Sequence, residues 1–302
     1  MASGKWPHYC RALLVKSVDT AAKGFPNRPD RAPEGVHDVR KTLKEARALT
    51  RLFLKSVGEP ARVTIAALAA VRRRVGRARD LDVMEQRLAR LQPPVDIAKP
   101  VAEAIARERA AESRAHNGFG ANASRRQLAA IARRLEAWDL DGVDESDIVD
   151  AVARSYRQAR RRGRAAFETS DPVALHALRS RVVDLRYQLA ALAPAWPAAL
   201  TAQAEELNAL RDTLGAFNDL NVLGKFASER CGLPAEAMSA LTERLEERQK
   251  KLRRRAEIEF DRLFAETPNA FAARLAAYVK SPMEEPRSGE APPSRPSGHQ
   301  SP

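Results

Sequence analysis

The chain has 302 residues, 44% of them hydrophobic, which is enough for a globular protein with a substantial core. Its 52 lysines and arginines outnumber 39 acidic residues, and the net charge of +13 favours an anionic partner: nucleic acid, a polyphosphate or an acidic membrane surface. The two cysteines exclude a disulfide framework and a CxxC metal pair. Because the sequence has no apolar run of about 18 residues and no secretory leader, we expect a cytoplasmic protein without membrane insertion.

The composition predicts an all-α fold, because Ala, Leu and Arg are abundant while aromatic residues make up only 5% and strand-like runs are lacking. Segments rich in Gly and Pro divide the chain into helices. In chain order, we expect helices at 5–23, 36–55, 61–91 with a candidate break at Gly76, 100–116 opened by Pro100, 124–138, 148–167 capped by Asp147, 172–193 capped by residues 170–172, 198–230, 235–264 and 269–279. Residues 281–302 contain six prolines and no apolar periodicity, so they are predicted to be disordered.

The predicted helix 36–55 carries an apolar seam and a basic seam side by side. The apolar seam has the spacing of a core-facing helix, and the row next to it is cationic: His37, Arg40, Lys44, Arg47 and Arg51. Neighbouring charges about 5.5 Å apart repel by about 3 kcal/mol at an effective dielectric near 20, before screening. Since no acid interrupts the row, a bound polyanion is a candidate. A solvated face and pairing with acids of another helix are the alternatives.

A second arginine-rich segment, residues 154–164, contains six arginines and no acid. Helical spacing predicts that Arg157, Arg160, Arg161 and Arg164 share a face beside Tyr156. The planar guanidinium of arginine binds phosphate oxygens bidentately, whereas lysine supplies a point charge. This segment therefore suits a linear phosphate polymer, with a solvated polybasic face as the alternative. A later basic run at 250–255 is flanked by glutamates, which favour local neutralisation.

The second half of the sequence repeats features of the first half at a constant offset of 139 residues. The offset aligns Pro33 with Pro172, His37 with His176, Arg40 with Arg179, Arg47 with Arg186 and Gly76 with Gly215. We therefore predict an internal duplication: one helical bundle at 1–146, a second at 147–280, and a tail at 281–302. A pseudo-twofold axis between the copies would bring the two histidine-bearing helices near one another.

Each predicted copy carries a histidine near the start of a helix, followed by regularly spaced basic residues. The first copy reads H-x-x-R-x-x-x-K-x-x-R from His37, and the second reads H-x-x-R from His176 with an Arg-Tyr pair at 186–187. In both copies the histidine is followed 39 residues later by a related turn, GRARDLDV or GAFNDLNV. This pattern closely resembles the CHAD family, the conserved histidine α-helical domain, over residues 1–280. Val183 departs from it, standing where a lysine is expected.

The resemblance implies two helical bundles related by a pseudo-twofold around a basic central cavity that binds inorganic polyphosphate. It also implies a binding protein without catalytic activity or cofactor, associated with polyphosphate granules. Together with the basic rows, it selects these candidate ligands of polyphosphate: His37, Arg40, Lys44, Arg47, Arg51, Arg79, Arg157, Arg160, Arg161, Arg164, His176, Arg179, Arg186, Lys251 and Arg254.

The two histidines lie in the first turns of their helices, where the backbone N–H groups and the helix dipole favour an anion. Our hypothesis is that each imidazole donates a hydrogen bond to bound phosphate and gains a proton when it does so. A structural role for His37 and His176, bonding a neighbouring helix or carbonyl, is the alternative.

Two other functions stay open. A nucleic-acid-binding protein fits the charge, although the basic rows lack an aromatic stacking ladder and a recognition-helix signature. Asp80, Asp82 and Asp219 could belong to a metal-dependent polyphosphate or triphosphate hydrolase. The second copy, however, reads Asn218, Asp219 and Asn221, so we favour structural helix contacts, such as a salt bridge from Asp80 to a nearby arginine.

Overall fold

The computed structural model describes residues 5–25, 32–74, 78–115, 121–169 and 171–281, and all regular structure within these ranges is helical. The predicted all-α fold is confirmed. The helices are α1 (Lys5–Lys23), α2 (Ala32–Thr50), α3 (Glu59–Arg74), α4 (Ala78–Leu91), α5 (Val95–Ala115), α6 (Ala121–Glu136), α7 (Glu145–Thr169), α8 (Pro172–Ala191), α9 (Pro197–Arg230), α10 (Ala235–Leu263) and α11 (Pro268–Lys280), with short 3₁₀ helices η2 (Arg51–Phe53) and η3 (Ala193–Ala195).

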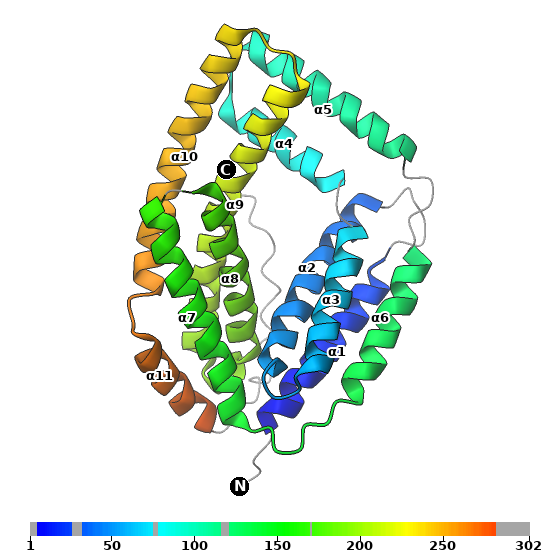
Figure 1. Cartoon of the computed structure of the whole chain (residues 1–302), viewed down its shortest axis with the longest axis vertical. Helices are drawn as coiled ribbons and strands as arrows, with labels where there is room; N and C mark the ends of the chain where they lie inside the picture. Colours follow the sequence, from blue (N-terminus) through cyan, green and yellow to red (C-terminus); the bar gives the residue numbers. More distant parts are fainter. Residues whose placement is uncertain (1–4, 26–31, 75–77, 116–120, 170, 282–302) are drawn as a thin grey trace.

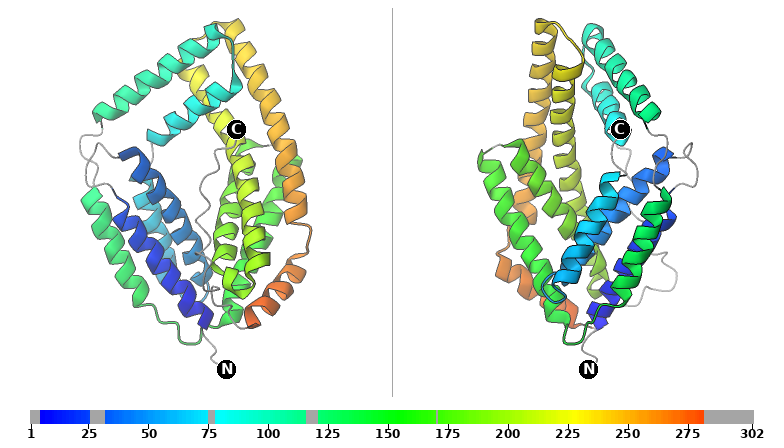
Figure 2. Two further views of the ribbon diagram at one scale, coloured as in Figure 1. Left: turned by 180° about the vertical axis from the view of Figure 1, so that it is seen from behind. Right: turned by 45° about the vertical axis from the view of Figure 1, so that its right-hand side comes forward.

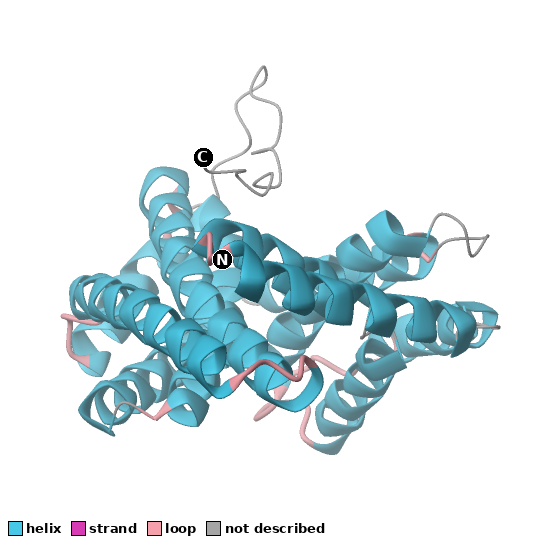
Figure 3. Ribbon diagram, turned by 90° about the horizontal axis from the view of Figure 1, so that it is seen from above, coloured by secondary structure: helices cyan, strands magenta, loops and turns pink. Residues whose placement is uncertain are grey.

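The helices form two groups that meet along α2 and α8 (Figure 1). In the first group, α1 packs on α2 and α6, and α3 packs on α2 and α6. In the second group, α8 packs between α7 and α9, with α10 on α9 and α11 on α7. Seen from the end of the molecule, the helices lie side by side with short loops between them (Figure 3).

The hairpin of α4 and α5 leaves the first group and reaches across to the second. Figures 1 and 2 show it lying across one end of the molecule, where α4 packs on α9 and α5 on α10. Leu88 and Val101 of the hairpin share an apolar cluster with Leu223 and Leu241, separate from the main core. The two halves are therefore joined at the α2–α8 contact, at this second cluster, and where α7 packs on η2 and α1.

Most predicted helix ends are confirmed because a capping residue or a breaker sets them. The carboxylate of Asp171 accepts hydrogen bonds from the backbone N–H groups of Val173 and Ala174 at 2.9 and 3.2 Å, and Pro172 follows in the first turn of α8. The long helix α9 ends at Arg230, as predicted, before the positive φ of Gly232. Only glycine adopts this left-handed backbone without strain.

Three predicted boundaries are wrong. Asp147 does not cap α7, because Asp144 accepts hydrogen bonds from the backbone N–H groups of Ser146 and Asp147 at 2.8 and 3.2 Å. Pro100 does not open α5, which begins at Val95 and contains the proline. The predicted helix 36–55 begins earlier, at Ala32, and its α-helical part ends at Thr50, where η2 follows. The residues around Gly76 and the tail from 282 onward lie outside the described residues.

Some helix starts repeat at a spacing within one residue of the offset of 139. α1, α2 and α5 begin at Lys5, Ala32 and Val95, while α7, α8 and α10 each begin 140 residues later. The contacts of α2 with α8, of the α4–α5 hairpin with α9 and α10, and of α1 with α7 join elements that the offset equates, whereas the contact of η2 with α7 does not. These observations support the predicted duplication, and the pseudo-twofold and the central cavity stay predictions. Among the described helices, none is long and apolar enough to cross a membrane.

Candidate anion-binding site

The contact between α2 and α8 is built from a small apolar patch and two hydrogen bonds to the backbone. Ala48 packs against Val183 and Tyr187. The amide of Gln188 donates to the carbonyl of Ala48 at 3.0 Å, and the Tyr187 hydroxyl donates to the carbonyl of Lys41 at 3.3 Å. Side chains of α8 thus bond α2 backbone at two places one turn or more apart, which fixes how the two helices cross.

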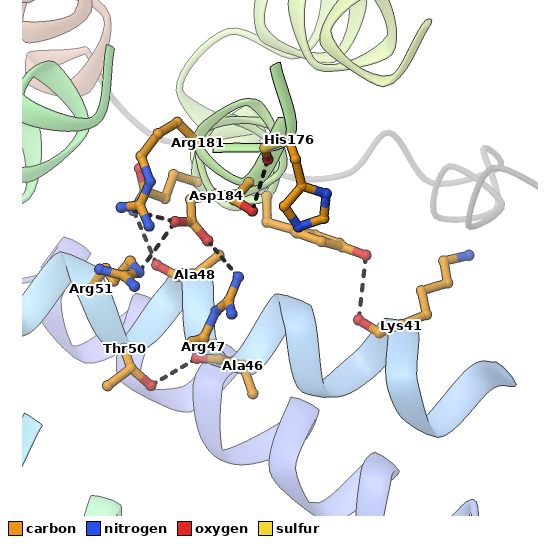
Figure 4. A network of polar contacts seen from close by, with 12 residues as sticks. Lys41, Ala46, Arg47, Ala48, Thr50, Arg51, His176, Arg181 and Asp184 are labelled. Carbon is orange, nitrogen blue, oxygen red and sulfur yellow. Dashed lines mark hydrogen bonds and ion pairs between the residues drawn. The ribbon is translucent and has the colours of Figure 1, made fainter. Parts of the chain in front are cut away.

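Three arginines surround one buried carboxylate at this crossing (Figure 4). Asp184 of α8 is 1% exposed, and its carboxylate lies 3.5 Å from Nη2 of Arg47, 3.2 Å from Nε of Arg51 and 3.3 Å from Nη1 of Arg181. Arg47 and Arg51 come from the first half of the chain, and Arg181 lies one turn before Asp184. We call these four residues the arginine cluster. It brings two predicted site residues together with two that were not predicted.

The positive charge extends beyond the arginine cluster on both sides. Burial lowers the pKa of Arg72 on α3, and the neighbouring charges of Arg47 and Arg40 lower it further. Burial also lowers the pKa of Arg181; Asp184 opposes this shift, whereas Arg51 and Arg162 of α7 add to it. An arginine whose pKa falls in this way lies where positive charge is disfavoured. A bound anion would relieve that crowding.

A second basic row lies on α8, on the other side of the crossing. We call it the α8 row, and it consists of His176, Arg179 and Arg186. Figure 4 shows His176 and Arg181 pointing to opposite sides of α8. His176 is exposed, with Nδ1 at 3.2 Å from Oδ1 of Asn218 on α9. Arg179 donates from Nε to the carbonyl of Arg211 at 3.4 Å. This row therefore faces α9, while the arginine cluster faces α2, α3 and α7.

Two further side chains of α8, those of Arg186 and Tyr187, lie on the side that faces α9. Arg186 is only 8% exposed, and its guanidinium carbon lies 4.6 Å from the centre of the Tyr187 ring. Burial raises the pKa of Tyr187; the charges of Arg186 and Arg211 oppose this shift and Glu45 adds to it. Under the offset of 139, Glu45 is the counterpart of Asp184 and Arg186 that of Arg47. Arg47 pairs with Asp184 of the other half, and the charges of both Arg186 and Glu45 act on Tyr187.

A family model described as CHAD domain matches residues 16–228. The chain belongs to the CHAD family. The matched part runs from α1 to α9 and includes the whole arginine cluster and the α8 row. The CHAD family is associated with binding of polyphosphate and triphosphate. A search of curated proteins finds no match to the chain. The match to the family model confirms the resemblance to the CHAD family that the sequence indicates.

The four predicted arginines of α7 in this CHAD domain lie on one side of the helix, but their side chains differ in exposure. Arg160 is half-buried and donates from Nε to the carbonyl of Phe264 at 2.9 Å, at the end of α10. Arg157, Arg161 and Arg164 are exposed, and Tyr156, expected beside them, is buried with its ring stacked on Phe271. Helical spacing does not give this difference in exposure, because it arises where α11 packs on α7.

The remaining predicted site residues of the CHAD domain lie in several places. Arg40 and Lys44 are half-buried on α2, beside the arginine cluster in sequence. Lys251 and Arg254 are exposed on α10, which packs on α9. The side chains of His37 and Arg79 lie outside the described residues.

Five residues near the α2–α8 crossing were not among the predicted site residues: Asp184, Arg181, Arg72, Arg162 and Arg211. One signal was available: Asp184 stands inside the apolar run 182–185 three residues after Arg181, and an acid at a core-facing position needs a basic partner. A second signal was that the offset of 139 equates Arg72 with Arg211. Neither signal says which arginines meet the acid, because that depends on how α2 and α8 cross.

The acidic residues considered as metal ligands make helix contacts in this CHAD domain. Asp219 of α9 accepts hydrogen bonds from Nε and Nη2 of Arg87 on α4 at 3.2 and 3.0 Å. Asp82 of α4 pairs with Arg109 of α5 at 2.8 Å. Within the described residues, no three His, Cys, Asp or Glu side chains form a group that could hold a metal ion. The structural interpretation is confirmed for Asp82 and Asp219, while Asp80 lies outside the described side chains.

Proposed function

We propose that this CHAD domain binds inorganic polyphosphate along α2, at the arginine cluster and the basic residues that precede it. The observation that carries the proposal is the charge imbalance at the α2–α8 crossing, where Arg47, Arg51 and Arg181 share the single carboxylate of Asp184. The family's association with polyphosphate and triphosphate supports the same ligand class.

A linear polyphosphate suits this arrangement better than a single small anion. Arg40, Lys44, Arg47 and Arg51 follow one another along α2 and η2 at intervals of three or four residues, so they present charge at successive turns. A polymer carries a negative charge on each phosphate and can neutralise several turns at once. Arginine adds bidentate hydrogen bonds to phosphate oxygens.

The α8 row would supply a second surface for the same polymer. His176, Arg179 and Arg186 occupy positions that the offset of 139 equates with His37, Arg40 and Arg47. We propose that the histidines orient the chain and the arginines neutralise it, without hydrolysis, and that the protein associates with polyphosphate granules. Arg157, Arg161, Arg164, Lys251 and Arg254, which are exposed, would act as outer contacts.

Direct binding of polyphosphate of defined length tests the proposal. We expect the triple variant Arg40→Ala, Lys44→Ala, Arg47→Ala to lose several kcal/mol of binding free energy, because each charge-assisted contact contributes about 1.5–3 kcal/mol without strict additivity. Arg51 and Arg181 still pair with Asp184 in this variant, so the buried carboxylate keeps partners.

A matched control removes three exposed arginines of α6, Arg126, Arg133 and Arg134, and so makes the same change in net charge. Equal affinities for wild type and the α2 variant would contradict the proposed site. Competition by duplex DNA and RNA at fixed salt separates the nucleic-acid alternative, since charge alone gives binding to any polyanion. Release of phosphate in the presence of Mg²⁺ or Mn²⁺ would reveal a hydrolase.

A further inference from the structure

Asp184 is the acid at the centre of the arginine cluster, and its environment is unusual for a carboxylate. It lies between Val183 and Leu185 on α8, and its side chain is 1% exposed. A buried carboxylate is costly unless it is paired, and one arginine is enough to pair it. Here three arginines from two halves of the chain approach it. The cluster thus holds more positive charge than the folding of Asp184 requires.

The arginines have donors to spare at this place. Asp184 lies nearest one nitrogen of each guanidinium, while each guanidinium carries five N–H groups. Within the described part of the chain, Nε of Arg47 and Nε of Arg181 are buried without a hydrogen-bond partner. The carboxylate therefore leaves some N–H donors of each arginine unused. Its effect on a bound anion is electrostatic rather than steric.

We infer that Asp184 is a built-in counter-ion, which keeps the arginine cluster assembled without ligand and weakens its attraction for anions; this inference rests on the proposed polyphosphate site. A single phosphate gains little from arginines that a carboxylate already half neutralises. A polymer gains more, because it can also reach Arg72, which is coupled to Arg47 and Arg40, and Arg162, which is coupled to Arg181. Asp184 thus sets the preference for polymeric phosphate over free phosphate.

The variant Asp184→Asn tests this, since it removes the charge and keeps the shape. In buffer free of phosphate, we expect the variant to melt at a lower temperature than wild type. We expect it to bind polyphosphate of defined length about tenfold more tightly. Removing one negative charge several Å from the anion in a partly solvated site changes the binding free energy by about that much. Inorganic phosphate should compete in the variant at concentrations that leave wild type unaffected.

Asp82→Asn is the matched control. It makes the same change in net charge but affects the Arg109 pair between α4 and α5, so it should leave the preference for polymer unchanged. A charge-balanced variant, Asp184→Asn with Arg181→Gln, restores the net charge of the arginine cluster, so it should melt closer to wild type than Asp184→Asn does. If Asp184→Asn does not fold and the balanced variant does, the counter-ion role is supported. If the balanced variant also fails to fold while Arg181→Gln alone folds, Asp184 is needed for packing and the inference is overturned.

Weaker or unchanged polyphosphate binding by Asp184→Asn, with no new sensitivity to inorganic phosphate, would also overturn the inference. Failure of wild type to bind polyphosphate would instead refute the proposed function. The two failures are distinguishable by tripolyphosphate added during thermal unfolding: a counter-ion role predicts a larger rise in melting temperature for Asp184→Asn than for wild type, whichever polyanion the site serves.

Discussion

Gly163 lies in the arginine-rich helix α7 at a point where α10 leaves no room for a side chain. A Cβ atom added there would lie 2.0 Å from Cε2 and 2.3 Å from Cζ of Phe260. Ordinary contacts between carbon atoms are about 3.5–4.0 Å. The Phe260 ring is 3% exposed and packed between the rings of Phe264 and Phe167, at 4.8 and 5.3 Å between centroids. It therefore has little space into which to move.

Two effects of Gly163→Ala oppose each other. In an exposed helix interior, alanine is more favourable than glycine by about 1 kcal/mol. Overpacking a core costs about 1–3 kcal/mol, and the depth of this overlap places the cost near the upper end. The net expected loss is about 2 kcal/mol of unfolding free energy, which lowers the melting temperature by about 4–8 °C for a chain of this size. Urea unfolding followed by circular dichroism measures the loss directly.

Gly224→Ala is the matched control, because its Cβ would meet only a flexible methyl group of Leu245, at 3.1 Å. It should be close to neutral. Gly163→Ala should cost less stability in a Phe260→Leu background than in wild type, because the ring that clashes is gone. If Gly163→Ala unfolds at the same urea concentration as wild type or a higher one, the packing of α7 against α10 described above is wrong.

Two other predictions concern the site and the response to pH. Gly215→Ala places a Cβ 3.2 Å from Nε and Nη2 of Arg179. It should keep the stability of the protein or raise it by up to about 1 kcal/mol, while weakening polyphosphate binding. Parallel melting and titration experiments check this, and unchanged affinity would show that Arg179 is not part of the site. Burial raises the pKa of Tyr156 to about 12, compared with about 10 in the unfolded chain, so its contribution to stability is present below pH 10 and lost as pH rises from about 10 to 12, by up to about 1.4 kcal/mol per pH unit. Tyr156→Phe loses the hydrogen bond to the carbonyl of Glu266, 3.1 Å long, but its stability should fall less steeply over that range in alkaline denaturation; parallel curves would contradict this assignment.

The helices could be predicted because their ends are set by local chemistry. Asp171 and Pro172 begin α8 through a side-chain cap and a fixed φ, and neither depends on the rest of the fold. Pro100 misled the prediction because a proline near the start of a helix removes only one hydrogen bond, and burial of Ile97 and Val101 on either side of it compensates. Tertiary packing overrode the local signal there.

The site could be predicted only in part. The row on α2 follows from the spacing of Arg47 and Arg51, since residues three or four apart share a helix face. Their common partner could not be found in this way, because Asp184 lies more than a hundred residues further along the chain and meets them only through the crossing of α2 and α8. The burial of Arg160 could not be predicted for a similar reason, because its side chain turns to the end of α10.

The contacts of α2 with α8 and of the α4–α5 hairpin with α9 and α10 each pair an element with its own counterpart under the offset of 139. Such contacts are self-complementary, like those across the axis of a symmetric homodimer. A molecule half as long could make both of them with a second copy of itself, but only at concentrations that favour association. In the predicted duplication, joining the two copies in one chain removes that dependence on concentration. It also frees each copy to change alone, as the lysine at position 44 and the valine at its counterpart, position 183, illustrate.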